Sequence, residues 1–255
     1  MTTKRLRIFA GPNGSGKSSL YAFLVRRGYF SKRISIDADV IAQRLGTNGF
    51  GLQRWPVSCD WEGFLASARR SSRPTHGLRL EELERGLVLK GRVFRWRGRR
   101  SATALNVVAA LLADYLVERM LEQDGTFSCE TVFSHQSKLE LISRAKVRGF
   151  RVYLYFVSTR DPEINCERVK TRVAQGGHPV PRNKVIARYR KTLENARAAM
   201  SLADRVYFFD NSESVKGSFL NFATFDNGKI TFSDADNVPA WFVEYVLPNS
   251  HGKQT

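Results

Sequence analysis

The stretch FAGPNGSGKSSLY, from Phe9 to Tyr21, decides the fold. Its residues 11–18 fit the pattern G-x-x-x-x-G-K-[ST], which follows a predicted strand and opens a predicted helix. In such a loop the glycines let backbone N–H groups surround phosphates, the lysine neutralises β- and γ-phosphate oxygens, and the serine hydroxyl is a ligand of Mg²⁺. We therefore predict binding of a nucleoside triphosphate such as ATP, with Mg²⁺ on Ser18. The candidate residues are Gly11, Asn13, Gly14, Ser15, Gly16, Lys17, Ser18 and Ser19.

Around this loop, short apolar or β-branched runs alternate with longer helical patterns, which is typical of a parallel α/β sheet with helices on both faces. Near the C-terminus, two alternating stretches flank Asn227-Gly228 and predict a β-hairpin. The predicted strands are Arg5–Ala10, Arg33–Asp37, Thr126–Val132, Arg151–Ser158 and Arg205–Asp210, and the helices begin near Lys17, Ala102, Gln136, Pro162 and Lys184.

Residues 46–100 interrupt this alternation and are too many for an ordinary loop. From Arg69 to Arg100 there are eleven basic residues against three acidic ones, so this stretch carries +8 of the chain's net charge of +17. Because aromatic residues (Trp55, Trp61, Phe64, Phe94 and Trp96) accompany this charge, we predict a folded insertion. The expected organisation is a P-loop domain over 1–45 and 101–248, the insertion over 46–100, and a flexible tail over 249–255.

The composition indicates which kinds of partner and which location to expect. The 255 residues include 41 Lys and Arg against 24 Asp and Glu, which favours polyanionic partners: nucleotides, nucleic acid or an acidic protein. Three cysteines without paired spacing indicate neither a zinc site nor a disulfide framework. No apolar run approaches the roughly 20 residues that span a bilayer, so we expect a cytoplasmic protein without a membrane partner.

Acidic residues follow two of the predicted strands. Asp37 and Asp39 follow the second strand, and Glu130 and Thr131 end the third. Ligands of an open α/β sheet bind at the carboxyl ends of its strands, and phosphoryl transfer needs carboxylates that orient a hydroxyl and hold Mg²⁺. Asp37 fits a Mg²⁺ ligand and equally the N-cap of the next helix.

A helix, a break at Gly176-Gly177 and a second helix follow the fourth strand, with arginines on both sides of the break. Arginines so placed can close over phosphates as a lid and stabilise charge on the transferred group. The same pattern also fits a solvated pair of basic helices.

Six motifs together resemble those of the zeta-toxin-like P-loop kinases, in the family's order: GPNGSGKSSLY, DADVIA, CETVFSHQSKLELISRAKVRGFRVYLYFVST, RVAQGGHPVP, RYRKTLENA and ADRVYFFDNS. The resemblance covers about Lys4–Leu45 and Ser101–Phe242. It implies a nucleoside-kinase-like sheet of order 2-3-1-4-5 that transfers the γ-phosphoryl of ATP or GTP to a hydroxyl of a nucleotide-linked small molecule such as a UDP-amino sugar. It also implies an antitoxin protein as a candidate partner.

The resemblance assigns roles residue by residue. Asp39 matches the catalytic base, Glu130 a substrate-contacting acid and Arg172 a lid arginine. The turn at Asp210 and Asn211 matches the one that borders the nucleobase. The second lid arginine has no clean counterpart among His178, Arg182 and Arg188, and we choose Arg188.

The chain departs from the family where the acceptor binds, because the insertion over 46–100 replaces the toxins' substrate loop. Its arginines and tryptophans suit a nucleotide-linked acceptor, but they also suit single-stranded nucleic acid. The alternative function is therefore an ATP-dependent nucleic-acid-binding protein or polynucleotide kinase. In a third interpretation the tryptophans only pack a small subdomain.

Overall fold

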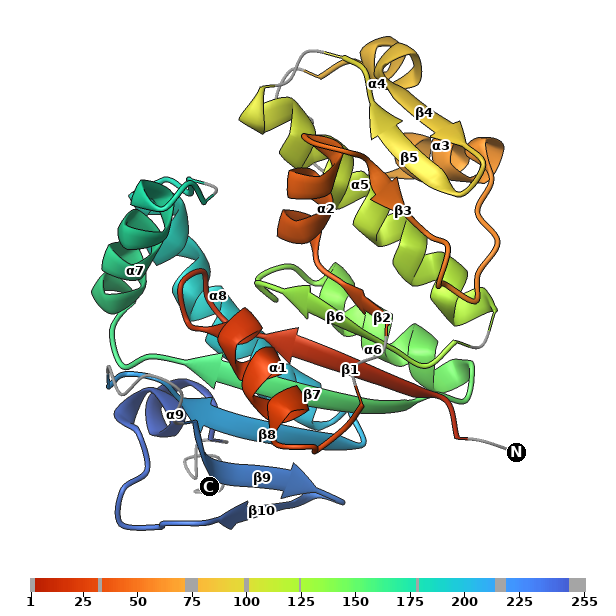
Figure 1. Cartoon of the computed structure of the whole chain (residues 1–255). Coiled ribbons are helices and arrows are strands. Elements are labelled where there is room, and N and C mark those ends of the chain that lie inside the picture. Colours follow the sequence, from red (N-terminus) through yellow and green to blue (C-terminus); the bar gives the residue numbers. More distant parts are fainter. Residues whose placement is uncertain are drawn as a thin grey trace, which may run out of the picture. The chain divides into compact units, whose positions relative to one another are not determined.

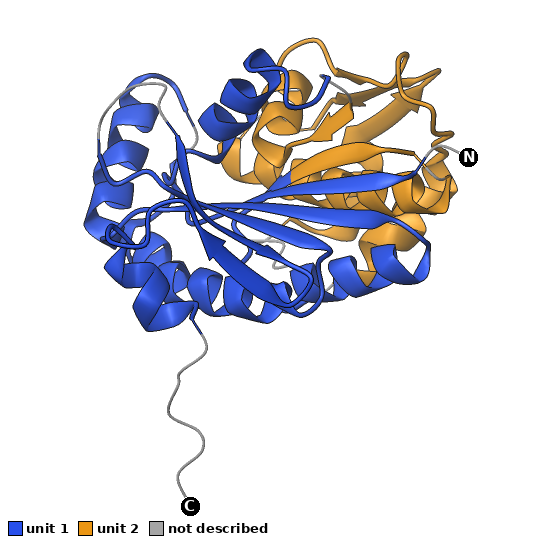
Figure 2. Ribbon diagram, turned by 90° about the horizontal axis from the view of Figure 1, so that it is seen from below, with its two compact units in different colours: residues 1–32, 130–255 blue, residues 33–129 orange. Residues whose placement is uncertain are grey.

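The computed structural model describes residues 3–31, 34–71, 78–98, 101–123, 125–177, 179–213 and 219–247. The predicted tail, His178 and the first residue of the second predicted strand, Arg33, lie outside these ranges. The chain forms two compact units: unit 1 contains residues 1–32 and 130–255, and unit 2 contains residues 33–129 (Figure 2).

Unit 1 is built on a sheet in which three parallel strands lie in the order β1-β7-β8 (Figure 1). Two antiparallel strands, β9 and β10, continue the sheet beyond β8 and are joined by the turn at Asn227-Gly228. The predicted hairpin is confirmed, and its pairing with β8 is an additional feature that the local turn signal did not predict. The strands are β1 (Arg5–Ala10), β7 (Arg151–Ser158), β8 (Arg205–Asp210), β9 (Leu220–Asp226) and β10 (Lys229–Phe232).

Helices cover both faces of this sheet. On one face, Leu20 and Leu24 of α1 pack against Phe9 of β1. On the opposite face, Trp241 and Phe242 of α9 pack against aromatic side chains of β7, β8 and β9. The helices of unit 1 are α1 (Lys17–Arg26), α6 (Ser137–Val147), α7 (Pro162–Ala174), α8 (Arg182–Met200) and α9 (Ala240–Tyr245).

Unit 2 begins with β2, which pairs in parallel with β6; the last two residues of β6 already belong to unit 1. A second, small antiparallel sheet has the order β3-β5-β4. The elements are β2 (Ile34–Ile36), α2 (Ala38–Leu45), β3 (Phe50–Gly51), α3 (Trp61–Arg70), α4 (Leu80–Gly86), β4 (Leu87–Lys90), β5 (Val93–Trp96), α5 (Ala102–Glu122) and β6 (Phe127–Thr131).

The basic insertion has an aromatic core of its own. Phe64 and Phe94 are fully buried, with ring centroids 5.9 Å apart, and Phe64 also packs edge to face on Tyr115 of α5 at 5.7 Å. Trp96 is 4% exposed, so packing accounts for this tryptophan. The guanidinium of Arg92 donates hydrogen bonds to three backbone carbonyls, those of Leu52, Trp55 and Val57.

The unit borders differ from the expected domain borders. Helix α5 packs against α2 and α3, and this packing gathers residues 33–45 and 101–129 into the same unit as the insertion. The expected order 2-3-1-4-5 corresponds to β2-β6-β1-β7-β8 in the present labels. Within unit 2 the pair β2–β6 agrees with it, and within unit 1 the order β1-β7-β8 agrees with it. None of the helices in the described ranges has the length and hydropathy needed for a bilayer crossing.

Candidate nucleotide-binding site

The glycine-rich loop after β1 has a backbone that only glycine allows at three positions. Gly11, Gly14 and Gly16 have φ values of 152°, 77° and 98°. A Cβ atom would lie 2.0 Å from the Val157 carbonyl oxygen at Gly11 and 2.5 Å from the Asn165 carbonyl oxygen at Gly14. The loop is therefore held tightly against β7 and α7, and side chains at these positions would prevent this approach.

The lysine and serine of the motif stand at the start of α1. Lys17 Nζ donates hydrogen bonds to the carbonyl oxygens of Gly11 and Pro12, at 3.0 and 2.8 Å. Ser18 Oγ donates to Glu130 Oε2 at 2.7 Å. The structure thus brings together the predicted Mg²⁺ ligand and the acid at the end of β6.

The turn after β8 also contacts the glycine-rich loop. Asn211 Nδ2 donates to the Ser15 carbonyl at 2.8 Å, and a Cβ on Gly16 would lie only 2.4 Å from this nitrogen. Both carboxylate oxygens of Asp210 accept hydrogen bonds, from Ser212 and from Trp241 Nε1. Asp210 therefore stabilises the turn, and Asn211 is the residue of the turn that contacts the glycine-rich loop.

Arg168 is one of the arginines of the predicted lid, and its contact with the turn after β8 was not predicted from the sequence. From the middle of α7 its guanidinium donates to the Asn211 carbonyl at 2.7 Å. Burial lowers the pKa of this guanidinium, although the side chain stays charged at neutral pH. The helical arginine pattern contained it, but only the long-range contact with Asn211 distinguishes it from its neighbours.

Helices α7 and α8 form the predicted pair with a break between them. Gly176, with φ of 84°, ends α7, and Cys166 and Val169 pack against Val185 of α8. Arg182 forms an ion pair with Glu163 across the two helices. The predicted lid arginines, Arg172 and Arg188, are both half-buried on these helices.

Helix α8 also fixes the loop that follows β6. Thr192 Oγ1 donates to the Val132 carbonyl at 2.9 Å, and Asn195 Nδ2 donates to the Phe133 carbonyl at 2.8 Å. Phe133 has a φ of 66°, which is uncommon for a bulky residue. Thr131 is a predicted substrate-binding residue. Its hydroxyl accepts a hydrogen bond from the Phe133 N–H at 3.2 Å, so within the protein it already stabilises this loop.

Two predicted residues lie in unit 2. Asp37 is the N-cap of α2, because its Oδ1 accepts from the Asp39 N–H at 2.9 Å. The capping interpretation of Asp37 is therefore confirmed, and its Mg²⁺ role stays a prediction. Asp39 lies in the first turn of α2, with its side chain exposed.

The residues present fit a nucleotide with Mg²⁺. The loop has three glycines in the left-handed region, and the buried Ser15 hydroxyl has no partner among the described residues. Ser18 and Glu130 offer oxygen ligands, which Mg²⁺ prefers alongside phosphate oxygens and water. The donor set and the loop geometry thus agree with the predicted cofactors.

Comparisons with known proteins place the chain among P-loop folds. The model of a family described as AAA domain matches residues 6–196. An uncharacterized protein of Haemophilus influenzae is 35% identical over 69 residues, which are 27% of this chain and 49% of that protein. The chain thus matches about half the length of this curated relative.

The similar solved structures are more distant in sequence. The AvrRxo1-ORF1:AvrRxo1-ORF2 complex superposes with a TM-score of 0.57 with sulphate ions and 0.55 with ATP; each match has 14% identity and covers 92% of this chain and 62% of that chain. The chain therefore spans less than two thirds of that protein. The PezAT toxin-antitoxin system of Streptococcus pneumoniae has a TM-score of 0.48, 12% identity, and coverage of 86% and 70%. The family match and the AvrRxo1 complexes confirm the predicted α/β P-loop fold.

Proposed function

Since the chain belongs to the AAA domain family and has the fold expected of the zeta-toxin-like P-loop kinases, we propose that it is a kinase that uses ATP or GTP. Its acceptor is a hydroxyl of a nucleotide-linked small molecule such as a UDP-amino sugar. The observation that carries the proposal is the 2.7 Å hydrogen bond between Ser18 and Glu130 beside Lys17. It joins the phosphate-binding loop to an acid at the carboxyl end of a neighbouring strand, as phosphoryl transfer requires.

The residues of unit 1 have the following roles in this proposal. Lys17 exchanges its two carbonyl partners for phosphate oxygens when the nucleotide binds, and Ser18 and Glu130 hold Mg²⁺. Mg²⁺, when bound, neutralises charge on the phosphates. Arg172 and Arg188 stabilise charge on the transferred group, and Arg168 keeps the nucleobase turn in place through the Asn211 carbonyl.

Asp39 is the general base of the reaction in this proposal. Its assignment rests on the second acid of the DADVIA motif, which matches the base of the resembling family. The carboxylate accepts the proton of the acceptor hydroxyl while the hydroxyl oxygen attacks the γ-phosphorus, and ADP or GDP leaves. The insertion of unit 2 selects the acceptor, with its arginines supplying charge for the acceptor's own phosphates.

A protein partner is part of the proposal. AvrRxo1-ORF1 is seen in complex with AvrRxo1-ORF2, and the same complex is seen with ATP. By analogy with this shared fold, we expect an acidic antitoxin-like protein to bind the chain, whose net charge is +17.

The test is transfer of labelled γ-phosphoryl from ATP to a panel of UDP-sugars, NAD, nucleosides and short oligonucleotides. We expect a labelled small-molecule product with the natural chain and none with Lys17→Ala or Asp39→Asn. Asp39→Asn should bind ATP as well as the natural chain does, and Asp236→Asn, an exposed acid of unit 1, serves as the matched control. Full transfer by Asp39→Asn would show that Asp39 is not the general base. Label on oligonucleotides alone would favour the alternative function, a polynucleotide kinase.

A further inference from the structure

A row of charged and aromatic side chains crosses the sheet of unit 1 on its α1 side. Directly opposed residues on neighbouring strands project to the same face of a sheet. The register therefore places one residue from each of five strands in a single row: Arg7, Tyr153, Arg205, Asp226 and Lys229. The next row toward the phosphate loop contains Phe9, Tyr155, Tyr207, Thr224 and Thr231.

Helix α1 covers only a part of this face. Helix α1 packs over Phe9 of β1, Val157 of β7 and Phe209 of β8, so it covers β8 near its carboxyl end (Figure 1). Helix α9 packs on the opposite face, through Trp241 and Phe242. Among the described residues, no other helix lies in front of β8, β9 and β10 in Figure 1.

Three aromatic rings on this face form a stack that ends at the uncovered part. The rings of Phe9 and Tyr155 are 4.9 Å apart and nearly parallel, and those of Tyr155 and Tyr207 are 5.0 Å apart with an angle of 18°. Beyond Tyr207 the row continues with Thr224 and Thr231, whose side chains are short. A planar ring can therefore extend the stack over β9.

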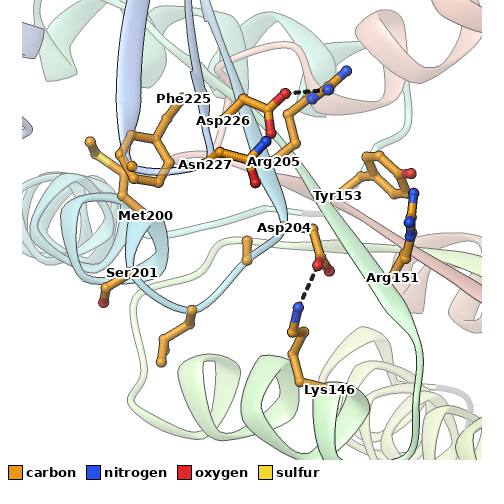
Figure 3. A pocket seen from close by; sticks show the side chains of 13 residues that line it. Lys146, Arg151, Tyr153, Met200, Ser201, Asp204, Arg205, Phe225, Asp226 and Asn227 are labelled. Atoms are coloured by element: carbon orange, nitrogen blue, oxygen red, sulfur yellow. Dashed lines mark hydrogen bonds and ion pairs between the residues drawn. The ribbon is translucent and has the colours of Figure 1, made fainter.

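Positive charge flanks the end of this stack. Asp226, the acid of the row, pairs with Arg205, and Asp204, the residue before Arg205, pairs with Lys146. Arg151, at the start of β7, forms no salt bridge among the described residues and points toward Tyr153 (Figure 3). Lys229 adds a further exposed cation at the start of β10.

A hollow of about 850 Å³ opens at the same edge of the sheet. Its lining includes three residues of the row, Tyr153, Arg205 and Asp226, and also Arg151 (Figure 3). The hollow lies at the amino ends of the parallel strands, whereas the glycine-rich loop follows the carboxyl end of β1. It is therefore separate from the nucleotide site within unit 1.

We propose that this face of β8, β9 and β10 binds single-stranded nucleic acid. A base stacks on Tyr207, and Arg151 and Lys229 contact the phosphates on either side of it. Single-strand binding commonly combines an aromatic platform with cations along the backbone. An acidic polypeptide would use the cations but has no need of a ring stack, so the observations favour the nucleic acid.

The test measures the anisotropy of a labelled 12-nucleotide single strand titrated with the full chain, without ATP, at several salt concentrations. The double variant Arg151→Ala, Lys229→Ala should weaken binding and reduce the slope of log Kd against log salt by about 1.4, which corresponds to two phosphate contacts. Tyr207→Leu should weaken binding roughly tenfold at an unchanged slope. Arg197→Ala, an exposed arginine of α8, and Tyr245→Leu, on α9, are the matched controls and should bind as the natural chain does.

Either of two results would overturn the proposal. An equal loss with Arg197→Ala would show that net charge alone attracts the strand. Equal competition by a polyglutamate peptide, with no effect of Tyr207→Leu, would assign the face to an acidic protein. The exposed double variant keeps the test valid if Tyr207→Leu does not fold. Because Lys17→Ala should bind the strand normally, failure of the kinase proposal leaves this result unaffected.

Discussion

At the scale of single residues, the contact between Ser18 and Glu130 makes a prediction about Mg²⁺. The Glu130 carboxylate lies 2.7 Å from the hydroxyl that is expected to bind the ion. Glu130→Gln removes the negative charge but keeps the shape, so about tenfold more Mg²⁺ should be needed for full ATP binding. Calorimetric titration of ATP at graded Mg²⁺ measures this.

The control for Glu130→Gln is Glu140→Gln, an exposed acid on α6. ATP binding without Mg²⁺ should be the same in both variants, because the charge of Glu130 is expected to interact with the ion and not with ATP itself. If Glu130→Gln needed no additional Mg²⁺, Glu130 would instead be the substrate-contacting acid that the family resemblance assigns.

Gly14 allows a second prediction with an internal control. Gly14 and Gly228 have nearly equal φ values, 77° and 79°, but a Cβ on Gly14 meets the Asn165 carbonyl at 2.5 Å, whereas a Cβ on Gly228 meets nothing within 4 Å. Gly228→Ala should therefore cost only the left-handed strain, about 1–2 kcal/mol of unfolding free energy. Gly14→Ala should cost more and weaken ATP binding at least about tenfold. Urea unfolding and ATP titration measure both, and equal costs would contradict the tight contact with α7.

At the scale of elements, α8 is predicted to hold the loop that follows Glu130. Asn195→Ala removes the hydrogen bond to the Phe133 carbonyl and should lower the unfolding free energy by about 1 kcal/mol. Because Phe133 then loses a restraint on its left-handed φ, transfer activity should fall as well. Urea unfolding and the transfer assay test this against Lys191→Ala on the exposed side of the same helix. A variant with lower stability but full activity would show that the loop does not position Glu130.

The sequence was sufficient for elements whose signals are local. Strands β1, β7 and β8 begin and end where their apolar runs do, and the turn at Asn227-Gly228 marks the hairpin. The pairing of β9 with β8 was not predicted, because it depends on residues distant in the chain. The small sheet of the insertion was also missed: its strands have two to four residues, and in Val93–Trp96 the arginine resembled surface charge rather than the outer side of a strand.

The candidate site divides in the same way. The glycine-rich loop could be predicted because eight consecutive residues specify its backbone. The contacts of Arg168 and Asn195 could not be predicted, because each side chain donates to a backbone carbonyl more than 40 residues away in the sequence. The role of Asp37 was ambiguous for a local reason: an N-cap and a metal ligand use the same carboxylate, and the structure confirms the cap.

At the scale of the whole molecule, the division into two units makes a prediction about the order of ligand binding. The loop, Glu130, Asn211 and Arg168 all belong to unit 1, whereas Asp39 and the insertion belong to unit 2. ATP with Mg²⁺ should therefore slow amide hydrogen exchange in unit 1, first around residues 11–20 and in α7, because binding stabilises the segments that hold the ligand. The acceptor, added with a non-transferable ATP analogue, should extend protection to α2 and to the insertion. Lys17→Ala, which lacks the charge that holds the phosphates, is the control for the first step. If the acceptor protected only unit 1, the insertion would not select it, and the assignment of Asp39 as the base would lose its support.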